Sequence, residues 1–240
     1  MIERLRRKLS AARVTLRSFS AGITRNPAFG DIDAWCASHA ARDARTAPRR
    51  TLDLGCGPTP RNPFKAEQVS GIDIRDNPKL DIRHADLTVE RIPFDDATFD
   101  YVTAFDFIEH VPRVTYLPAR RFPFIELMNE IWRVLKPGGL LYAVTPVYPH
   151  VAAFQDPTHV NALTTGTHEY FVRPRRLAAM YGFVGDFVAR RIEPTRHHDS
   201  AAAYHPPPAN AWQRLRLAHR IRRGACGHVI WELEAVKAGA

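Results

Sequence analysis

The chain has 240 residues, of which 45% are hydrophobic, and it carries a formal net charge of +9. This length suits one α/β domain with appendages, and the apolar content suffices for a full core. No stretch approaches the about 18 uninterrupted apolar residues of a transmembrane helix, and the basic N-terminus lacks the apolar segment of a secretory signal. The three cysteines lie far apart without a CxxC pair, which argues against a disulfide framework and fits a reducing cytoplasm.

The segment 1–28 is expected to be a basic amphipathic helical appendage. One apolar stripe recurs at three- and four-residue steps among arginines, and it comprises Ile2, Leu5, Leu9, Ala12, Leu16 and Phe19. Such a helix lies on an anionic membrane surface, or it packs on its own domain or on a second subunit. Peripheral contact with the inner membrane face and a homo-oligomer therefore both remain open.

The rest of the chain alternates between strand and helix patterns. We expect strands at 51–54, 69–74, 80–84, 99–105, 140–145, 183–192 and 228–236, and helices at 30–47, 127–135, 175–181 and around 212–223. We expect a break before the fifth strand at Pro137, Gly138 and Gly139. We expect the helix at 175–181 to end at Gly182. Alternation of this kind predicts a parallel sheet covered on both faces by helices.

Two glycines follow the first expected strand, in the run Asp53-Leu54-Gly55-Cys56-Gly57-Pro58. Glycines there let a ligand approach the backbone at the carboxyl edge of the sheet. Asp73 ends the second strand about 20 residues later, where a carboxylate can accept both hydrogen bonds of a ribose diol. Asp86 follows the third strand, where it either accepts from an adenine amino group or caps a loop.

Five motifs in this order resemble the Rossmann-like class I S-adenosylmethionine-dependent methyltransferases. They are the glycine turn at 52–58, Gly71-Ile72-Asp73-Ile74, Ala85-Asp86-Leu87, and the segments 92–102 and 130–140. The resemblance implies a seven-stranded, mostly parallel sheet with helices on both faces and an antiparallel last strand. The domain would span 29–240, with insertions near 112–124, 146–172 and 194–227, and its cofactor would be S-adenosyl-L-methionine.

The resemblance also assigns roles to individual positions. Asp53, Gly55, Cys56 and Gly57 would surround the methionine portion of the cofactor, and Asp73 with Ile74 the ribose. Asp86 and Leu87 would flank the adenine, while Phe105 and Asp106 would lie beside the reactive methyl group. The sequence departs from the family at Pro58 and Pro60, where many relatives carry a further glycine, so the following helix is expected to start late or be short.

The polar segment 154–161, Phe-Gln-Asp-Pro-Thr-His-Val-Asn, is the main candidate for the acceptor side. It resembles a segment of methyltransferases of bacterial surface-polysaccharide and related glycan pathways. We expect His159, His110 and Asp156 to be catalytic, with His159 as general base for a hydroxyl. One alternative is a purely structural loop. The other is a divalent metal bound by Asp156, His159 and either His110 or His150, although our leading expectation is that no metal is bound.

Several acceptors are compatible with this reading. A saccharide or glycolipid intermediate is the leading expectation, because aromatics and arginines mix in 113–124, although that loop could equally be a surface lid. A small metabolite such as a quinone or natural product is the main alternative. A nucleic-acid acceptor is not expected, because residues 106–109 lack the tetrapeptide typical of base N-methylation. A non-catalytic binding module with the same fold is the remaining alternative.

Overall fold

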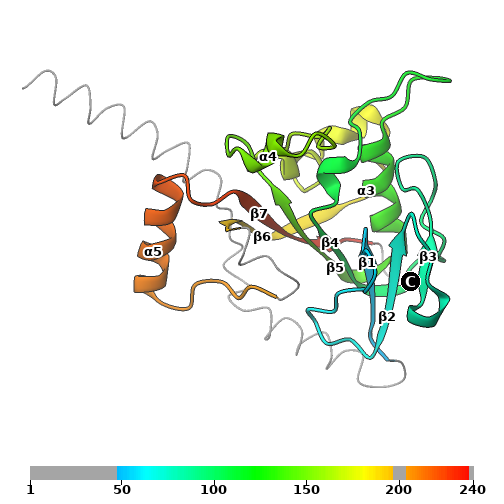
Figure 1. Ribbon diagram of the computed structural model, residues 1–240, viewed down its shortest axis with the longest axis horizontal. Coiled ribbons are helices and arrows are strands. Elements are labelled where there is room, and N and C mark those ends of the chain that lie inside the picture. Colours follow the sequence, from blue (N-terminus) through cyan, green and yellow to red (C-terminus); the bar gives the residue numbers. More distant parts are fainter. Residues whose placement is uncertain (1–47, 197–203, 238–240) are drawn as a thin grey trace, which may run out of the picture.

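The computed structural model describes residues 48–196 and 204–237 (Figure 1). The appendage expected at 1–28 and the helix expected at 30–47 lie outside the described residues. The described part contains a central sheet with one long helix against it and a second helix, α5, set apart from it, as Figure 1 shows.

The sheet has seven strands in the order β3-β2-β1-β4-β5-β7-β6. The strands are β1 (Arg50–Leu54), β2 (Gln68–Asp73), β3 (Ile82–His84), β4 (Phe99–Phe105), β5 (Leu135–Pro146), β6 (Phe187–Thr195) and β7 (His228–Ala235). The first five pair in parallel, whereas β7 runs antiparallel to both β5 and β6. This topology confirms the expected seven-stranded, mostly parallel sheet with an antiparallel last strand.

Helix α3 (Pro123–Val134) covers one face of the sheet. Its buried positions recur at three- and four-residue steps, which gives the helix one apolar stripe; they include Phe124, Leu127, Met128, Ile131 and Val134. Proline at the first helical position loses no intrahelical hydrogen bond, so the helix begins at Pro123, four residues before the expected start.

The expected break at 137–139 is a bulge inside β5 rather than a turn before it. On β4, Phe99 pairs with Leu135 and Tyr101 with Leu140, so the intervening residues of β5 leave the ladder. Gly138 has a φ of +75°, a conformation that glycine adopts without strain. Strand β5 therefore starts directly after α3 and is longer than expected.

Two expected elements near the C-terminal half differ from the structure. The helix expected at 175–181 is a shorter 3-10 helix, η4 (Leu177–Tyr181), closed as expected by Gly182. Strand β6 begins at Phe187 rather than at 183, because the Asn129 side chain accepts from the backbone N–H groups of Val184 and Gly185. Those amides are thus held by a side chain of α3 instead of by a neighbouring strand.

No helix connects β1 to β2; residues 55–67 form an irregular loop stiffened by Pro58 and Pro60. Phe64 of this loop stacks on Tyr101 of β4 with ring centroids 4.4 Å apart, and it anchors a smaller apolar cluster. The late or short helix expected here is absent altogether, so the loop covers this part of the sheet by itself.

Helix α5 (Ala211–Arg222) occupies the insertion expected at 194–227. Its N-cap is Asn210, whose side chain accepts from the backbone of Gln213, and Ile221 is the one buried residue of the helix. None of the helices within 48–196 and 204–237 combines the length and apolar character needed to cross a membrane.

His168 is buried beside Trp231 of β7, and its Nδ1 lies 2.9 Å from the carbonyl oxygen of Thr165. Burial lowers the pKa of this imidazole below its ordinary value of 6.5. The folded state therefore keeps His168 neutral at pH values where the unfolded chain already binds a proton.

We predict that stability falls below about pH 6.5, by up to about 1.4 kcal/mol per pH unit, through His168 alone. His168→Asn keeps a donor for Thr165 and removes the titration, so the stability gap between wild type and variant should narrow as the pH falls. Urea unfolding at pH 7.5, 6.5 and 5.5 measures this. His219→Asn, on the exposed face of α5, is the control, and parallel curves for wild type and His168→Asn would contradict the prediction.

Candidate active site

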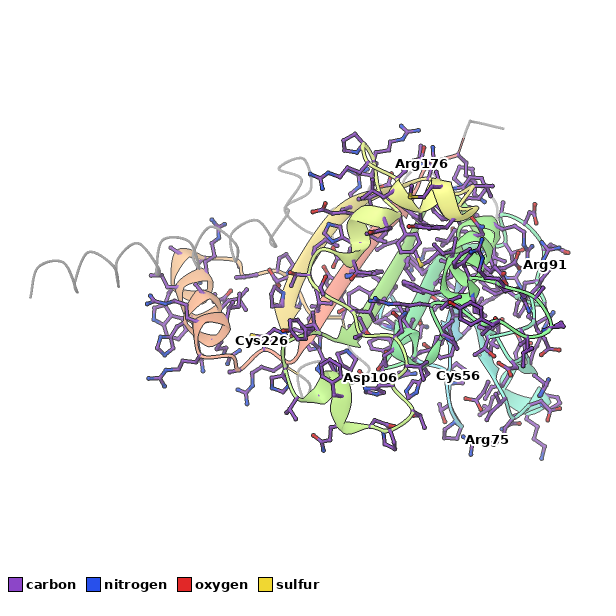
Figure 2. All side chains as sticks on the ribbon, turned by 90° about the horizontal axis from the view of Figure 1, so that it is seen from above. Cys56, Arg75, Arg91, Asp106, Arg176 and Cys226 are labelled. Carbon is purple, nitrogen blue, oxygen red and sulfur yellow. The ribbon has the colours of Figure 1, made fainter. Side chains whose placement is uncertain are left out.

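The loops that follow β1, β2, β4 and β5 meet at the carboxyl edge of the sheet. Figure 2 shows Cys56, which follows β1, and Asp106, which follows β4, at this same edge. Parallel pairing brings these strand ends together, and ligands of open α/β sheets bind there.

Gly55 and Gly57 both lie in the left-handed region, with φ of +60° and +62°. A Cβ on Gly55 would lie 2.4 Å from the ring of Phe107, so the loop after β1 packs directly on the loop after β4. A Cβ on Gly57 would meet no atom within 4 Å. Gly55 is thus required by packing as well as by conformation, whereas Gly57 faces open space that a ligand can use.

Cys56 points back into the protein rather than toward this space. It is buried, and its Sγ would lie 2.5 Å from a Cβ on Gly71 of β2. Burial raises the pKa of the thiol to about 11, which keeps it protonated and unreactive. The contribution of Cys56 to the site is therefore to seat the glycine loop on β2.

Asp73, at the end of β2, fastens the glycine loop from the other side. Its Oδ2 accepts from the Gly57 N–H at 2.9 Å, and its Oδ1 accepts from the Arg75 N–H at 3.1 Å and from the Arg75 Nε at 3.4 Å. A carboxylate has about four lone-pair positions, so about one remains for a ligand hydroxyl while the exposed Arg75 side chain stays in place. The neighbouring Ile74 is 66% exposed and offers an apolar surface next to this carboxylate.

Asp53 is completely buried, and it does not face the open space. Its Oδ2 accepts from the backbone and the Nε of Arg61, and its Oδ1 accepts from Thr103 of β4. The guanidinium of Arg61 also donates to the carbonyl of Gly55 and lies 4.7 Å over the ring of Phe105. Arg61, which the sequence did not single out, thus presents a fixed positive charge above Asp53.

The loop after β3 shows the capping alternative for Asp86. Its Oδ1 accepts from the backbone and the hydroxyl of Thr88, at 2.9 and 2.6 Å. Leu87 is buried in the main core. In this geometry neither the Asp86 nor the Leu87 side chain points to an open ligand position. The backbone of both residues lies at the carboxyl edge of the sheet.

Asp106 directly follows β4 and has a φ of +48°, which is uncommon for a residue with a Cβ. Its Oδ1 lies 3.0 Å from Nε2 of His228, the first residue of β7. Strained backbone of this kind persists where the surroundings hold it and is often found at functional sites.

His110 and His159 come together as expected, with ring centroids 4.9 Å apart. Asp156 lies beside them, its Oδ2 4.0 Å from Nε2 of His159. His150 does not join this group, because its ring packs on Gly227 and its Nδ1 accepts from the backbone of Ala152.

Glu109 is the residue of this group that the sequence analysis missed. It belongs to the 3-10 turn η2 (Ile108–His110), is 1% exposed, and accepts from the Thr145 hydroxyl at 2.9 Å. Burial raises its pKa to about 8. From the sequence alone, a carboxylate next to a histidine is expected on the surface. Only the turn after β4 directs the Glu109 side chain inward.

Residues 52–143 match the family described as "Methyltransferase domain". The chain is also 31% identical over 114 residues to a Mycolicibacterium smegmatis protein named "Probable S-adenosylmethionine-dependent methyltransferase/" and 30% identical over 122 residues to a Listeria welshimeri protein named "Demethylmenaquinone methyltransferase". These matches cover 42% and 43% of this chain, and 40% and 48% of the relatives. The chain therefore spans less than half the length of either relative.

Among solved structures, the chain resembles a methyltransferase described as S-adenosylmethionine-dependent from Archaeoglobus fulgidus at 17% identity, covering 83% of this chain and 92% of that one with a TM-score of 0.45. The family match, the strand order and the glycine loop together define residues 52–143 as a class I methyltransferase domain, whose cofactor is S-adenosylmethionine.

The two glycines of the cofactor loop make different structural demands, which a matched pair of variants can separate. Gly57→Ala strains only the backbone and should cost about 1–2 kcal/mol of unfolding free energy. Gly55→Ala adds a clash with Phe107 and should cost about 1–3 kcal/mol more. Urea unfolding of both variants measures the difference, and equal losses would mean that Phe107 yields to the added methyl group.

Proposed function

We propose that this protein transfers a methyl group from S-adenosylmethionine to a small acceptor with an apolar, ring-bearing body, such as a quinol. The observation that carries the acceptor class is a cavity of about 660 Å³ between α3, η4 and the loop 113–124. Its walls are mainly aromatic, formed by Phe122, Phe124, Tyr170 and Tyr181, with Arg113 at one side. Apolar walls with a few polar groups are typical of small-molecule sites.

Hydrogen bonds link one wall of the cavity to the turn after β4. Arg113, which lines the cavity, donates from Nε to the side chain of Asn161 at 2.7 Å. The backbone N–H of Asn161 in turn donates to the carbonyl of Glu109 at 2.9 Å. On this link we base the proposal that the acceptor bound in the cavity presents its hydroxyl toward Glu109 and His159.

The residues present fit the cofactor. Three features support this fit: space lies open over Gly57, Asp73 keeps an acceptor position for the ribose, and the exposed Ile74 offers an apolar surface for the base. We assign the carboxylate of the methionine portion to Arg61, whose side chain is 24% exposed. The cofactor supplies a methyl group already activated on a sulfonium, so the protein has mainly to position the acceptor.

The acceptor oxygen must lose its proton as it gains the methyl carbon. His159 is the side chain that we expect to take this proton, with the Asp156 carboxylate 4.0 Å from its Nε2 to stabilise the charged imidazole and Glu109 on its other side. His110, held by Thr158, completes the wall of this group.

A saccharide acceptor remains the second proposal. The polar segment 154–161 suggested it, yet much of its polarity is used inside the protein: Asp156 accepts from Thr158, and Asn161 bonds with Arg113 and with the carbonyl of Ile108. Neither reported relative is named for a sugar, and one is named for demethylmenaquinone. Contact of this protein with a membrane or with a second copy stays a prediction.

The role of Arg61 can be tested by ligand binding without any acceptor. Arg61→Met should lower the affinity for S-adenosylhomocysteine by roughly 10-fold to 100-fold, which corresponds to the loss of a charge-assisted hydrogen bond. It should barely affect 5′-methylthioadenosine, which lacks the amino-acid portion. Calorimetry gives both affinities, with Arg49→Met, before the amino end of β1, as control. Equal losses for the two ligands would assign Arg61 to loop structure alone.

The acceptor class can be tested with methyl-labelled cofactor and matched acceptors. Label should enter a quinol or phenol and not a sugar. Tyr181→Ala should raise KM, while Tyr116→Ala, at an exposed position of the loop 113–124, should leave KM unchanged. His159→Ala should lower kcat by roughly 100-fold or more. Label in sugars alone would replace this proposal with the saccharide one.

A further inference from the structure

The side chains of Glu109, His110 and His159 converge on one point. One ligand atom of each lies within 4.8 Å of the others. Glu109 and His110 come from η2, directly after β4, whereas His159 comes from the loop 50 residues further along the chain. Two histidines and a carboxylate are a donor set that binds divalent transition metals.

The carboxylate of Glu109 has an acceptor atom that the described protein does not satisfy. Its Oε2 takes the Thr145 hydroxyl, but its Oε1 is buried and has no hydrogen-bond partner among the described residues. A buried polar atom without a partner is costly, and a carboxylate oxygen more so. A cation at this point would remove that cost.

The distances inside the group are those of separate ligands rather than of hydrogen-bonded partners. His159 Nε2 lies 3.9 Å from Glu109 Oε1 and 4.0 Å from Asp156 Oδ2. These separations exceed hydrogen-bond length, and a modest inward rotation brings the atoms to the spacing of ligands around a common ion.

The hydrogen bonds of Thr158 fix the tautomer of His110. The Thr158 hydroxyl has one proton, which it donates to Asp156 Oδ1 at 2.6 Å. Its oxygen must then accept from His110 Nδ1, 3.0 Å away, so Nδ1 carries the ring proton. The Nε2 of His110 is left with its lone pair, the state that a metal-bound histidine requires.

We propose that Glu109, His110 and His159 bind one divalent metal ion of the Zn²⁺ type, with Asp156 near enough to act as a further ligand. Only the role of the ion rests on the proposed function: an ion here would bind the acceptor hydroxyl and lower the pKa of that hydroxyl. With the ion bound, His159 would be a ligand and could not also take the proton of the acceptor. The lowered pKa would then let the hydroxyl release that proton to solvent before the methyl transfer.

Metal binding can be measured without cofactor or acceptor, which separates this proposal from the proposed function. Protein stripped with a chelator is titrated with Zn²⁺ by calorimetry and with Co²⁺ by visible absorption. We expect one ion per chain and a Co²⁺ spectrum that Zn²⁺ abolishes. The affinity for Zn²⁺ should fall by more than about 10-fold in each of the variants Glu109→Gln, His110→Ala and His159→Ala. It should fall by about 10-fold in Thr158→Val, which acts through His110.

Two controls decide the location of the ion. His197→Ala/His198→Ala removes an adjacent histidine pair that lies outside the described residues, and His219→Ala removes an exposed histidine of α5; both should leave Zn²⁺ affinity unchanged. Thermal unfolding and S-adenosylhomocysteine binding show that each variant is folded. Absence of stoichiometric binding, or binding lost with His197 and His198 but kept without Glu109 and His159, would overturn the proposal.

Discussion

The close packing of Phe107 against Gly55 is the constraint on which both halves of the site depend. It joins the loop after β1, which carries the cofactor glycines, to the turn after β4, which carries Glu109 and His110. Because a Cβ at position 55 would meet the ring of Phe107, glycine is what lets the two loops approach this closely. The relative position of the two halves of the site therefore depends on the contact of one aromatic side chain with the Gly55 backbone.

The sheet and the glycine loop could be predicted because their signals are local. Strand β4 was expected at its observed bounds, since five of its seven residues are aromatic or aliphatic and all seven are buried. Gly55 and Gly57 have a positive φ, which glycine adopts without strain. The bulge in β5 and the late start of β6 were missed because tertiary partners decide them: the pairing of Leu135 with Phe99, and the side chain of Asn129.

The candidate site could be predicted only in part. His110, His159 and Asp156 were expected together, and they are adjacent, because their polarity stands out in segments without a helical or strand pattern. Glu109 and Arg61 were missed. Nothing in the sequence distinguishes a carboxylate that a turn directs inward from one in solvent, or an arginine that lies over an aromatic ring from one on the surface.

The irregular loop between β1 and β2 affects how fast its backbone amides exchange with solvent. Without a helix, few of its amides are protected by repeated backbone bonds; Arg61 and Ala66 instead donate to the side chains of Asp53 and Asn62. Such amides exchange with solvent faster than those of the strands on either side. Hydrogen exchange of the amides between residues 59 and 66 therefore responds to whatever covers Gly57, while the amides of β1 and β2 stay protected.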